Sequence, residues 1–384
     1  MQRRDFVTLG SAIAAAASPL GIYAGHKIAI QSGSTGRQVD FIHDGLNLSP
    51  KEYSELLMKL ADEGKIKPDF YSNGGVVEEL ENKFASLLGK ESAVFMPTGT
   101  LANHIAIRHL AGDDRRVILQ EQSHFYNDSG DCAQTLSGLN LIPLGLNGVE
   151  FTLEEVQTVI EKTKRGRVET RIGVIAIETP VRRQFDRMLA HQKMKTISGY
   201  ARENGIRMHL DGARLFVQSV HTAITPAIYG ELFDTVLISL WKLFNSASGA
   251  VICGSKLFTE KLFHERRMFG GGLPAAWPFA AVALHFADQF IDEYSKAWKN
   301  AEGIFETLRK EPRFEVIPYE SGSHIIRVNV KNADLNRFSA SMLKRGIELP
   351  IPDDKGYYLK VNPSLNRMSA QNVVGYFLEA LKEG

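Results

Sequence analysis

The chain has 384 residues, enough for roughly two domains of about 150 residues each. Charged residues make up 23% and hydrophobic residues 44% of it, and these fractions exclude a disordered or fibrous protein. Because there are 45 basic and 44 acidic side chains, the formal net charge is +1, and no basic excess indicates a nucleic-acid partner. The two cysteines, Cys132 and Cys253, cannot form a disulfide framework or a four-cysteine zinc site.

The first 24 residues have the pattern of a targeting segment. Arg3 and Arg4 precede an apolar stretch rich in Ala, Gly and Ser, which carries no charge after Asp5 and is interrupted by Pro19. This pattern favours a removable signal peptide over a stable membrane span, and the paired arginines resemble a twin-arginine signal. We expect export to the periplasm, or a cytoplasmic protein with an apolar tail if the signal is not real. Residues 25–40, rich in Gly and Ser, are expected to form a linker.

Helices and short apolar strands alternate over the next 200 residues. Helical patterns begin after Ser49 and cover 76–88, 153–162 and 188–204, and another helix follows residue 100. Apolar segments predict strands at 93–96, 117–119, 141–144, 172–177, 208–210, 236–240 and 250–253. The alternation predicts an α/β fold with a mainly parallel sheet.

The glycine run at 270–272 ends this alternation. A long buried helix is expected at 275–290, followed by strands at 314–317, 324–330 and 357–361, with a helix at 335–345. We therefore predict a large domain with an N-terminal arm at 41–285 and a small α+β domain at 286–384.

Three polar features follow predicted strands, where open sheets of this kind bind ligands. The first is Pro-Thr-Gly-Thr at 97–100. Gly99 lets backbone N–H groups approach an anion at a helix N-terminus, and Thr100 can add a hydroxyl donor. The alternative is ordinary helix capping.

The other two features are an acid and an amine. Asp211 follows an apolar run and precedes Arg214 by three residues, so the two form either a structural ion pair or part of a site. Lys242 ends the run TVLISLWK at 235–242, where burial would lower its pKa and favour the neutral, nucleophilic amine. The alternative is a lysine whose head reaches water.

An anion-binding turn, an aspartate and a buried lysine, in this order, are what pyridoxal 5′-phosphate needs. Lys242 would form the Schiff base, and Asp211 would keep the pyridine nitrogen protonated. His124, which follows the strand at 117–119, could stack on the ring or be an ordinary loop histidine. His209 lies beside Asp211, but nothing here indicates a metal site.

With these residues in view, the stretch from about 71 to 272 resembles the threonine aldolase and β-eliminating lyase family of fold-type-I pyridoxal-phosphate enzymes. The matching segments are FMPTGTLAN at 95–103, QSH at 122–124, HLDGAR at 209–214, Lys242 and the glycines at 270–272. The resemblance implies a large domain with a mainly parallel sheet and a small C-terminal α+β domain. It implies roles for six residues: Gly99 and Thr100 on the phosphate, His124 on the ring, Asp211 on its nitrogen, Arg214 near the phosphate or a substrate carboxylate, and Lys242 as the Schiff-base lysine.

The substrate-binding positions of that family are changed in this chain. The family's Arg-Ser-Asp reads Ile-His-Asp at 42–44, its Glu-Asn-Thr-His-Asn is replaced by ETPVRR at 178–183, and its C-terminal arginine is replaced near Lys360. Tyr71 lies where the family places a tyrosine that reaches a neighbouring subunit, which implies a homodimer or homotetramer. The candidate substrate-binding residues are His43, Tyr71, Arg182, Arg214 and Lys360, with His43 or His124 as the base.

These observations predict a pyridoxal-phosphate lyase that acts on a small amino acid. The reaction would be aldol cleavage of a β-hydroxy amino acid or a related β-elimination, with an arginine gripping the carboxylate. Two alternatives stay open: an exported binding protein that keeps the fold without catalysis, and a fold-type-I aminotransferase.

Overall fold

The computed structural model describes residues 39–383. The predicted signal peptide and residues 25–38 of the predicted linker lie outside this range. The last two linker residues instead form strand β1 (Val39–Asp40), which pairs in parallel with β11 (Ile347–Glu348). Among the described helices, none combines the length and the apolar character needed to span a membrane.

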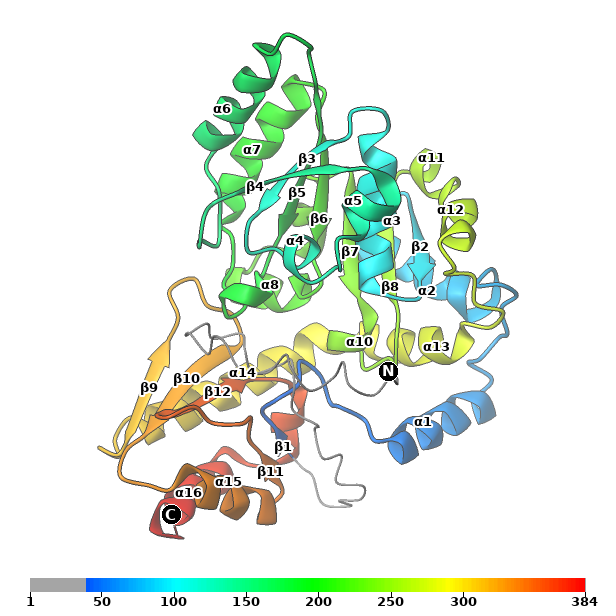
Figure 1. The fold of residues 1–384 in the computed structure, drawn as a ribbon. Coiled ribbons are helices and arrows are strands. Elements are labelled where there is room, and N and C mark those ends of the chain that lie inside the picture. The colour runs from blue at the N-terminus through cyan, green and yellow to red at the C-terminus, as the bar shows by residue number, and fades with distance from the viewer. Residues whose placement is uncertain (1–38, 384) are drawn as a thin grey trace, which may run out of the picture. The chain divides into compact units, whose positions relative to one another are not determined.

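A seven-stranded sheet forms the centre of the larger part, in the order β2-β8-β7-β6-β5-β3-β4 (Figure 1). Its strands are β2 (Ser92–Met96), β3 (Arg116–Gln120), β4 (Asn140–Leu144), β5 (Ile172–Glu178), β6 (Arg207–Asp211), β7 (Thr235–Ser239) and β8 (Ala250–Gly254). Strand β8 is antiparallel to both of its neighbours, and the other pairs are parallel. The carboxyl ends of β3, β5, β6 and β7 therefore meet at one edge.

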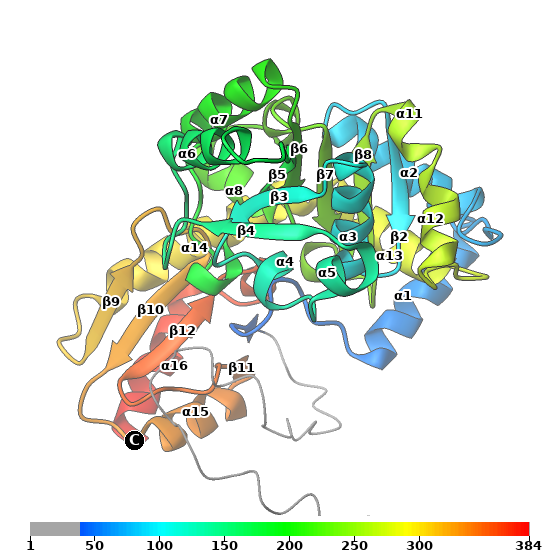
Figure 2. The ribbon, with the colours of Figure 1, turned by 45° about the horizontal axis from the view of Figure 1, so that its top comes forward.

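Both faces of this sheet are covered, which explains why its strands read as continuous apolar runs. On β5, Ile175 and Ile177 pack with α2 (Gly75–Leu87), α7 (His191–Glu203) and α13 (Trp277–Ala287). The alternate residues, Val174 and Ala176, belong to the opposite face, which α3 (Gly99–Ala111) and α5 (Cys132–Ser137) cover (Figure 2). The remaining helices of this part are α1 (Pro50–Asp62), α4 (His124–Asn127), α6 (Leu153–Lys164), α8 (Leu215–Thr222), α9 (Pro226–Gly230), α10 (Leu240–Leu243), α11 (Lys256–Thr259), α12 (Leu262–Met268) and the 3-10 helix η1 (Arg182–Gln184).

The C-terminal part has its own three-stranded antiparallel sheet, in the order β12-β10-β9. Its elements are β9 (Phe314–Pro318), β10 (Ile325–Val330), β12 (Gly356–Lys360), α14 (Phe290–Leu308), α15 (Leu335–Lys344), α16 (Ala370–Glu383) and the 3-10 helix η2 (Pro363–Arg367). They enclose a second hydrophobic core, which also takes in Val39 and Phe41. The first described residues thus pack with the end of the chain. The predicted fold class is confirmed; the division at 285/286 stays a prediction.

Two further sequence predictions differ from the structure. The helix predicted at 275–290 is two helices, because α13 ends at Ala287 and α14 begins at Phe290. The sequence did not reveal α14, whose 19 residues supply Tyr294 to the first core and Ala301 to the second. The strand predicted at 236–240 ends at Ser239, because the chain turns there into α10.

Candidate active site

The carboxyl edge of the sheet brings together five of the predicted residues. Asp211 ends β6, and Lys242 lies on α10 directly after β7. His124 begins α4 after β3, while Gly99 and Thr100 form the first turn of α3 after β2. These residues come from the ends of four different strands, so the fold itself assembles the site.

The Lys242 amine makes no hydrogen bond within the described part of the chain. Its nitrogen lies 5.8 Å from the centre of the Trp241 ring. Burial and the nearby Arg214 guanidinium lower the pKa of Lys242 to about 8, although the charge of Asp211 acts in the opposite direction. An amine with this pKa has a larger neutral fraction near neutral pH than an ordinary lysine, which favours a nucleophilic role.

Asp211 is almost completely buried and carries a negative charge. The Asn103 amide donates a hydrogen bond of 2.6 Å to its Oδ2, and the Ala213 N–H donates one of 3.2 Å to its Oδ1. Burial would raise the pKa of Asp211, but the nearby Lys242 and His124 side chains and the hydrogen bond from Asn103 together lower it. The carboxylate is therefore an acceptor that can hold a proton on a partner nitrogen.

His124 is held at the site through its backbone. Its N–H donates to Glu178 Oε2 at 2.5 Å, while its buried ring nitrogen Nδ1 has no hydrogen-bond partner. Burial lowers the pKa of the imidazole, so the neutral ring predominates at pH 7. A buried, neutral ring with an unpaired nitrogen fits a group that contacts a ligand.

Glu178 is a site residue whose role sequence reasoning missed. It ends β5, and its second carboxylate oxygen accepts the Arg182 N–H at 2.9 Å. Burial and the charge of Asp211 raise the pKa of Glu178 to about 7. The available signal was an acidic residue at the end of a fully apolar strand.

The N-terminus of α3 has open space beside Gly99, and the first N–H groups of a helix have no partner within the helix. The Thr98 hydroxyl caps the helix by accepting the Leu101 N–H, so the predicted capping interaction is present. A β-carbon at Gly99 would meet no atom within 4 Å. The hydroxyl of Ser239, which precedes α10, is buried without a partner. Sequence reasoning did not single out Ser239.

Arg214 and Lys360, two predicted carboxylate-binding residues, both contact Asp44. Arg214 donates from Nε and Nη2 to the two Asp44 oxygens at 3.1 and 2.8 Å, and Lys360 Nζ donates to Oδ1 at 2.9 Å. Asp186 lies 3.4 Å from Arg214 Nη1. Burial opposes charge on Arg214, yet Asp186 and Asp44 raise its pKa. The Arg214 guanidinium is thus already engaged by acids of the chain itself.

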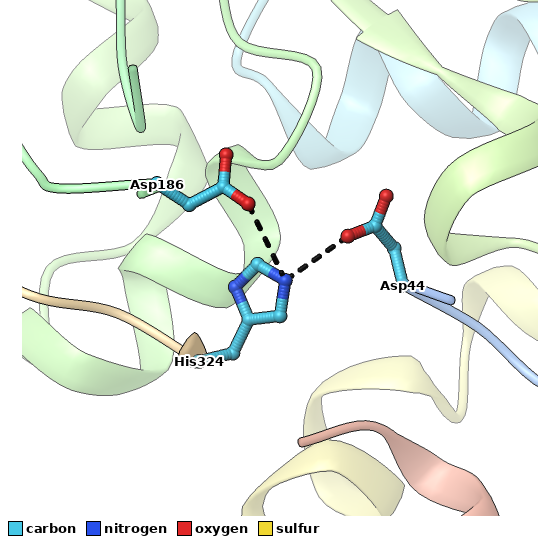
Figure 3. Close-up of side chains that lie close together, drawn as sticks. All are labelled: Asp44, Asp186 and His324. Carbon is cyan, nitrogen blue, oxygen red and sulfur yellow. Dashed lines mark hydrogen bonds and ion pairs between the residues drawn. The ribbon is translucent and has the colours of Figure 1, made fainter. Parts of the chain in front are cut away.

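The side chains of Asp44, Asp186 and His324 lie close together (Figure 3). His324 Nε2 lies 3.0 Å from Asp44 Oδ1 and 3.7 Å from Asp186 Oδ2, and one ligand atom of each residue lies within 4.8 Å of the others. A metal could use such atoms, but Arg214 and Lys360 supply two positive charges to the same carboxylates. We therefore interpret the cluster as a buried ion-pair network.

The other predicted substrate residues lie in different surroundings. His43 Nδ1 pairs with Asp40 at 2.8 Å; burial opposes its protonation, but Asp40 raises its pKa overall. Arg182 and its neighbour Arg183 share the single carboxylate of Asp128.

Within residues 39–383, no hydrogen bond or ring contact joins Tyr71 to Lys242 or Asp211. Its N–H donates to the Pro274 carbonyl, and the Arg267 guanidinium lies 4.6 Å from its ring centre.

The groups of the site match the parts of pyridoxal 5′-phosphate. The free amine of Lys242 suits its aldehyde, and the Asp211 carboxylate suits its ring nitrogen. The open helix terminus at Gly99 and the unpaired Ser239 hydroxyl suit its phosphate.

Residues 64–331, more than half of the chain, match the family model described as beta-eliminating lyase. The chain belongs to this family. Membership confirms the predicted resemblance, the lyase class and the cofactor, pyridoxal 5′-phosphate.

Proteins of similar sequence include the low-specificity L-threonine aldolases of Candida albicans and Saccharomyces cerevisiae. The first is 27% identical over 317 residues, covering 81% of this chain and 82% of the relative. The second is 29% identical over 302 residues, covering 76% and 74%. A solved structure of Leishmania major threonine aldolase superposes with a TM-score of 0.68 at 15% identity, covering 90% of this chain and 99% of the other, and supports the fold.

Proposed function

We propose that this β-eliminating lyase family member cleaves the Cα–Cβ bond of a β-hydroxy amino acid, as threonine aldolases do. The observation that carries the proposal is the amine of Lys242, which lies unpaired at the same strand-end edge as the Asp211 carboxylate. The named relatives are L-threonine aldolases. Because this chain differs from the family around Arg182 and Lys360, we propose the class of β-hydroxy amino acids as substrate and not threonine in particular.

Pyridoxal 5′-phosphate, when bound, supplies an electron sink for the bond that breaks. Lys242 provides the amine that tethers it, and the low pKa of Lys242 lets the amine lose and regain a proton near neutral pH. Asp211 holds a proton on the ring nitrogen through its buried charge. Gly99, Thr100 and Ser239 bind the phosphate by backbone and hydroxyl donors.

His124 is our candidate for the base that takes the proton of the substrate hydroxyl. Its Nδ1 is buried, neutral and unpaired, so it can accept a proton. The other candidate, His43, already pairs its Nδ1 with Asp40. Glu178 fixes the backbone of His124 and thereby its approach to the ring.

For the substrate carboxylate we favour Arg182. Arg214 is occupied by two buried acids, whereas Arg182 and Arg183 share one, which leaves an excess positive charge there. The Nε groups of both arginines are buried without partners. A carboxylate would satisfy such donors.

Two further proposals rest mainly on the sequence. A homodimer or homotetramer would cover Phe70, which is 75% exposed beside Tyr71. Export through a twin-arginine signal rests on residues 1–24 alone.

The test is the visible absorption of the purified protein with pyridoxal phosphate, followed by borohydride reduction. We expect a coloured protein whose cofactor becomes covalently fixed, and no fixation in Lys242→Ala. A panel of β-hydroxy amino acids, including threonine, allo-threonine and phenylserine, should release glycine and an aldehyde. Oxo-acid formation would instead indicate an aminotransferase, and a cofactor-loaded protein without turnover would indicate a binding protein.

A further inference from the structure

A continuous chain of hydrogen bonds leads away from Asp211 into the protein interior. Asn103 Nδ2 donates to Asp211 at 2.6 Å, His209 Nε2 lies 2.8 Å from Asn103 Oδ1, and His209 Nδ1 lies 2.8 Å from the hydroxyl of Thr235. Asn103, His209 and Thr235 are 2%, 1% and 0% exposed, so water does not compete for these bonds. None of the three has a role in the function proposed above.

Sequence spacing and register explain how the four side chains meet. His209 and Asp211 are two residues apart on β6, so both point to the same face of the sheet. Thr235 is the register partner of His209 on β7. Asn103 lies on α3, the helix that covers this face.

The donor and the acceptor of each hydrogen bond in this series follow from the neighbouring groups. The ionised carboxylate of Asp211 only accepts, so the Asn103 amide must donate with nitrogen and accept with oxygen. His209 must then carry its proton on Nε2. Burial lowers the pKa of His209 to about 4, so the ring is neutral and its Nδ1 accepts from the Thr235 hydroxyl.

We propose that Asn103, His209 and Thr235 are positioning residues that hold the Asp211 carboxylate ionised and oriented toward the ring nitrogen of the cofactor. The proposal rests on the assignment of Asp211 to that nitrogen. Apolar side chains could fill the same volume, and burying three polar groups is tolerated only when each is paired. The three side chains form one series of hydrogen bonds that ends at Asp211, and this arrangement indicates a role beyond packing.

Cofactor affinity and the visible spectrum of the loaded protein test the proposal without reference to turnover. Asn103→Leu removes the bond to Asp211 and should weaken binding of pyridoxal phosphate about tenfold, with a changed absorption band. Thr235→Val, which has nearly the same shape, should weaken it by a smaller factor, and Thr235→Ser should restore it. His209→Gln, which keeps a nitrogen donor in reach of Asn103, should bind better than His209→Leu.

The matched control is Thr163→Val, which removes another buried threonine hydroxyl that bonds a backbone carbonyl of α6. It should leave affinity and spectrum unchanged. Nitrogen-15 NMR of the loaded wild-type protein should show His209 neutral with its proton on Nε2. Because this measurement uses the wild-type protein, it tests the proposal even if a variant fails to fold.

The outcomes separate this inference from the assignment of Asp211. If Asp211→Asn leaves the spectrum and affinity unchanged, the assignment of Asp211 fails. If Asp211→Asn changes them but Asn103→Leu and Thr235→Val do not, only the positioning chain is overturned. A protonated His209, or one with its proton on Nδ1, also overturns it.

Discussion

Gly45 packs directly against the turn that carries Lys242. A β-carbon at position 45 would lie 2.7 Å from the Lys242 carbonyl oxygen and would also collide with the Asn245 side-chain oxygen. That oxygen accepts the Leu46 N–H at 2.7 Å, which ties the N-terminal segment to the turn. The segment before α1 therefore helps to set the position of the reactive amine.

Gly45→Ala should consequently displace this contact. We expect a loss of unfolding free energy of about 1–3 kcal/mol, as for other overpacked sites, together with weaker binding of pyridoxal phosphate. Denaturant unfolding and a cofactor titration measure the two effects. Gly303→Ala, on α14 with no atom within 4 Å of the added carbon, is the control and should cause neither loss.

Gly99→Ala should separate cofactor binding from folding. Its added β-carbon meets nothing in the protein, and alanine favours a helix, so the cofactor-free protein should keep or gain up to about 1 kcal/mol of stability. The same methyl group would occupy the space that we assign to the phosphate. Unchanged affinity for pyridoxal phosphate would contradict that assignment.

The sequence predicted the central sheet because its strands are apolar on both faces. The sequence also indicated candidate cofactor residues, since Gly99, Asp211 and Lys242 each lie at or just after the end of a strand. It could not reveal contacts between distant segments, such as Asp44 with Arg214, because neither local pattern encodes the other. The sequence alone therefore suggests a phosphate or carboxylate ligand for Arg214, whereas the structure pairs it with Asp44 and Asp186.

Short elements that depend on tertiary pairing could not be predicted from the sequence either. Strand β1 has two residues and exists only because β11 lies beside it. In the sequence, Glu178 stands out only as the first residue of the segment that replaces a family motif. Its bond to the His124 backbone depends on the neighbouring strands β3 and β5.

Breaking the ion pair between Asp44 and Arg214 should destabilise the protein strongly. Asp44→Asn leaves Arg214 and Lys360 with less negative charge in a buried place, and loss of one partner of such a pair costs about 3–5 kcal/mol. The comparison is Asp234→Asn: its partner Arg207 is 63% exposed, so loss of that ion pair itself should matter little. Denaturant unfolding of both variants at pH 7 makes the measurement. A small effect of Asp44→Asn would show that the network is not a structural requirement.

The lowered pKa of Lys242 predicts that burial of this side chain destabilises the cofactor-free protein by an amount that depends on pH. Below pH 8 the amine is protonated in both the folded and the unfolded state, so its burial lowers stability. Between about pH 8 and 10.5 the folded protein releases this proton while the unfolded chain keeps it, and the contribution to stability rises with pH. Lys242→Met should therefore be more stable than the cofactor-free wild type at pH 7, with a difference that shrinks toward pH 10. Urea unfolding across this range tests it, with Lys51→Met, at a side chain 77% exposed, as the control. A difference that grows with pH would mean that the protonated amine is favoured in the folded site, and the argument for a nucleophilic Lys242 would lose its electrostatic basis.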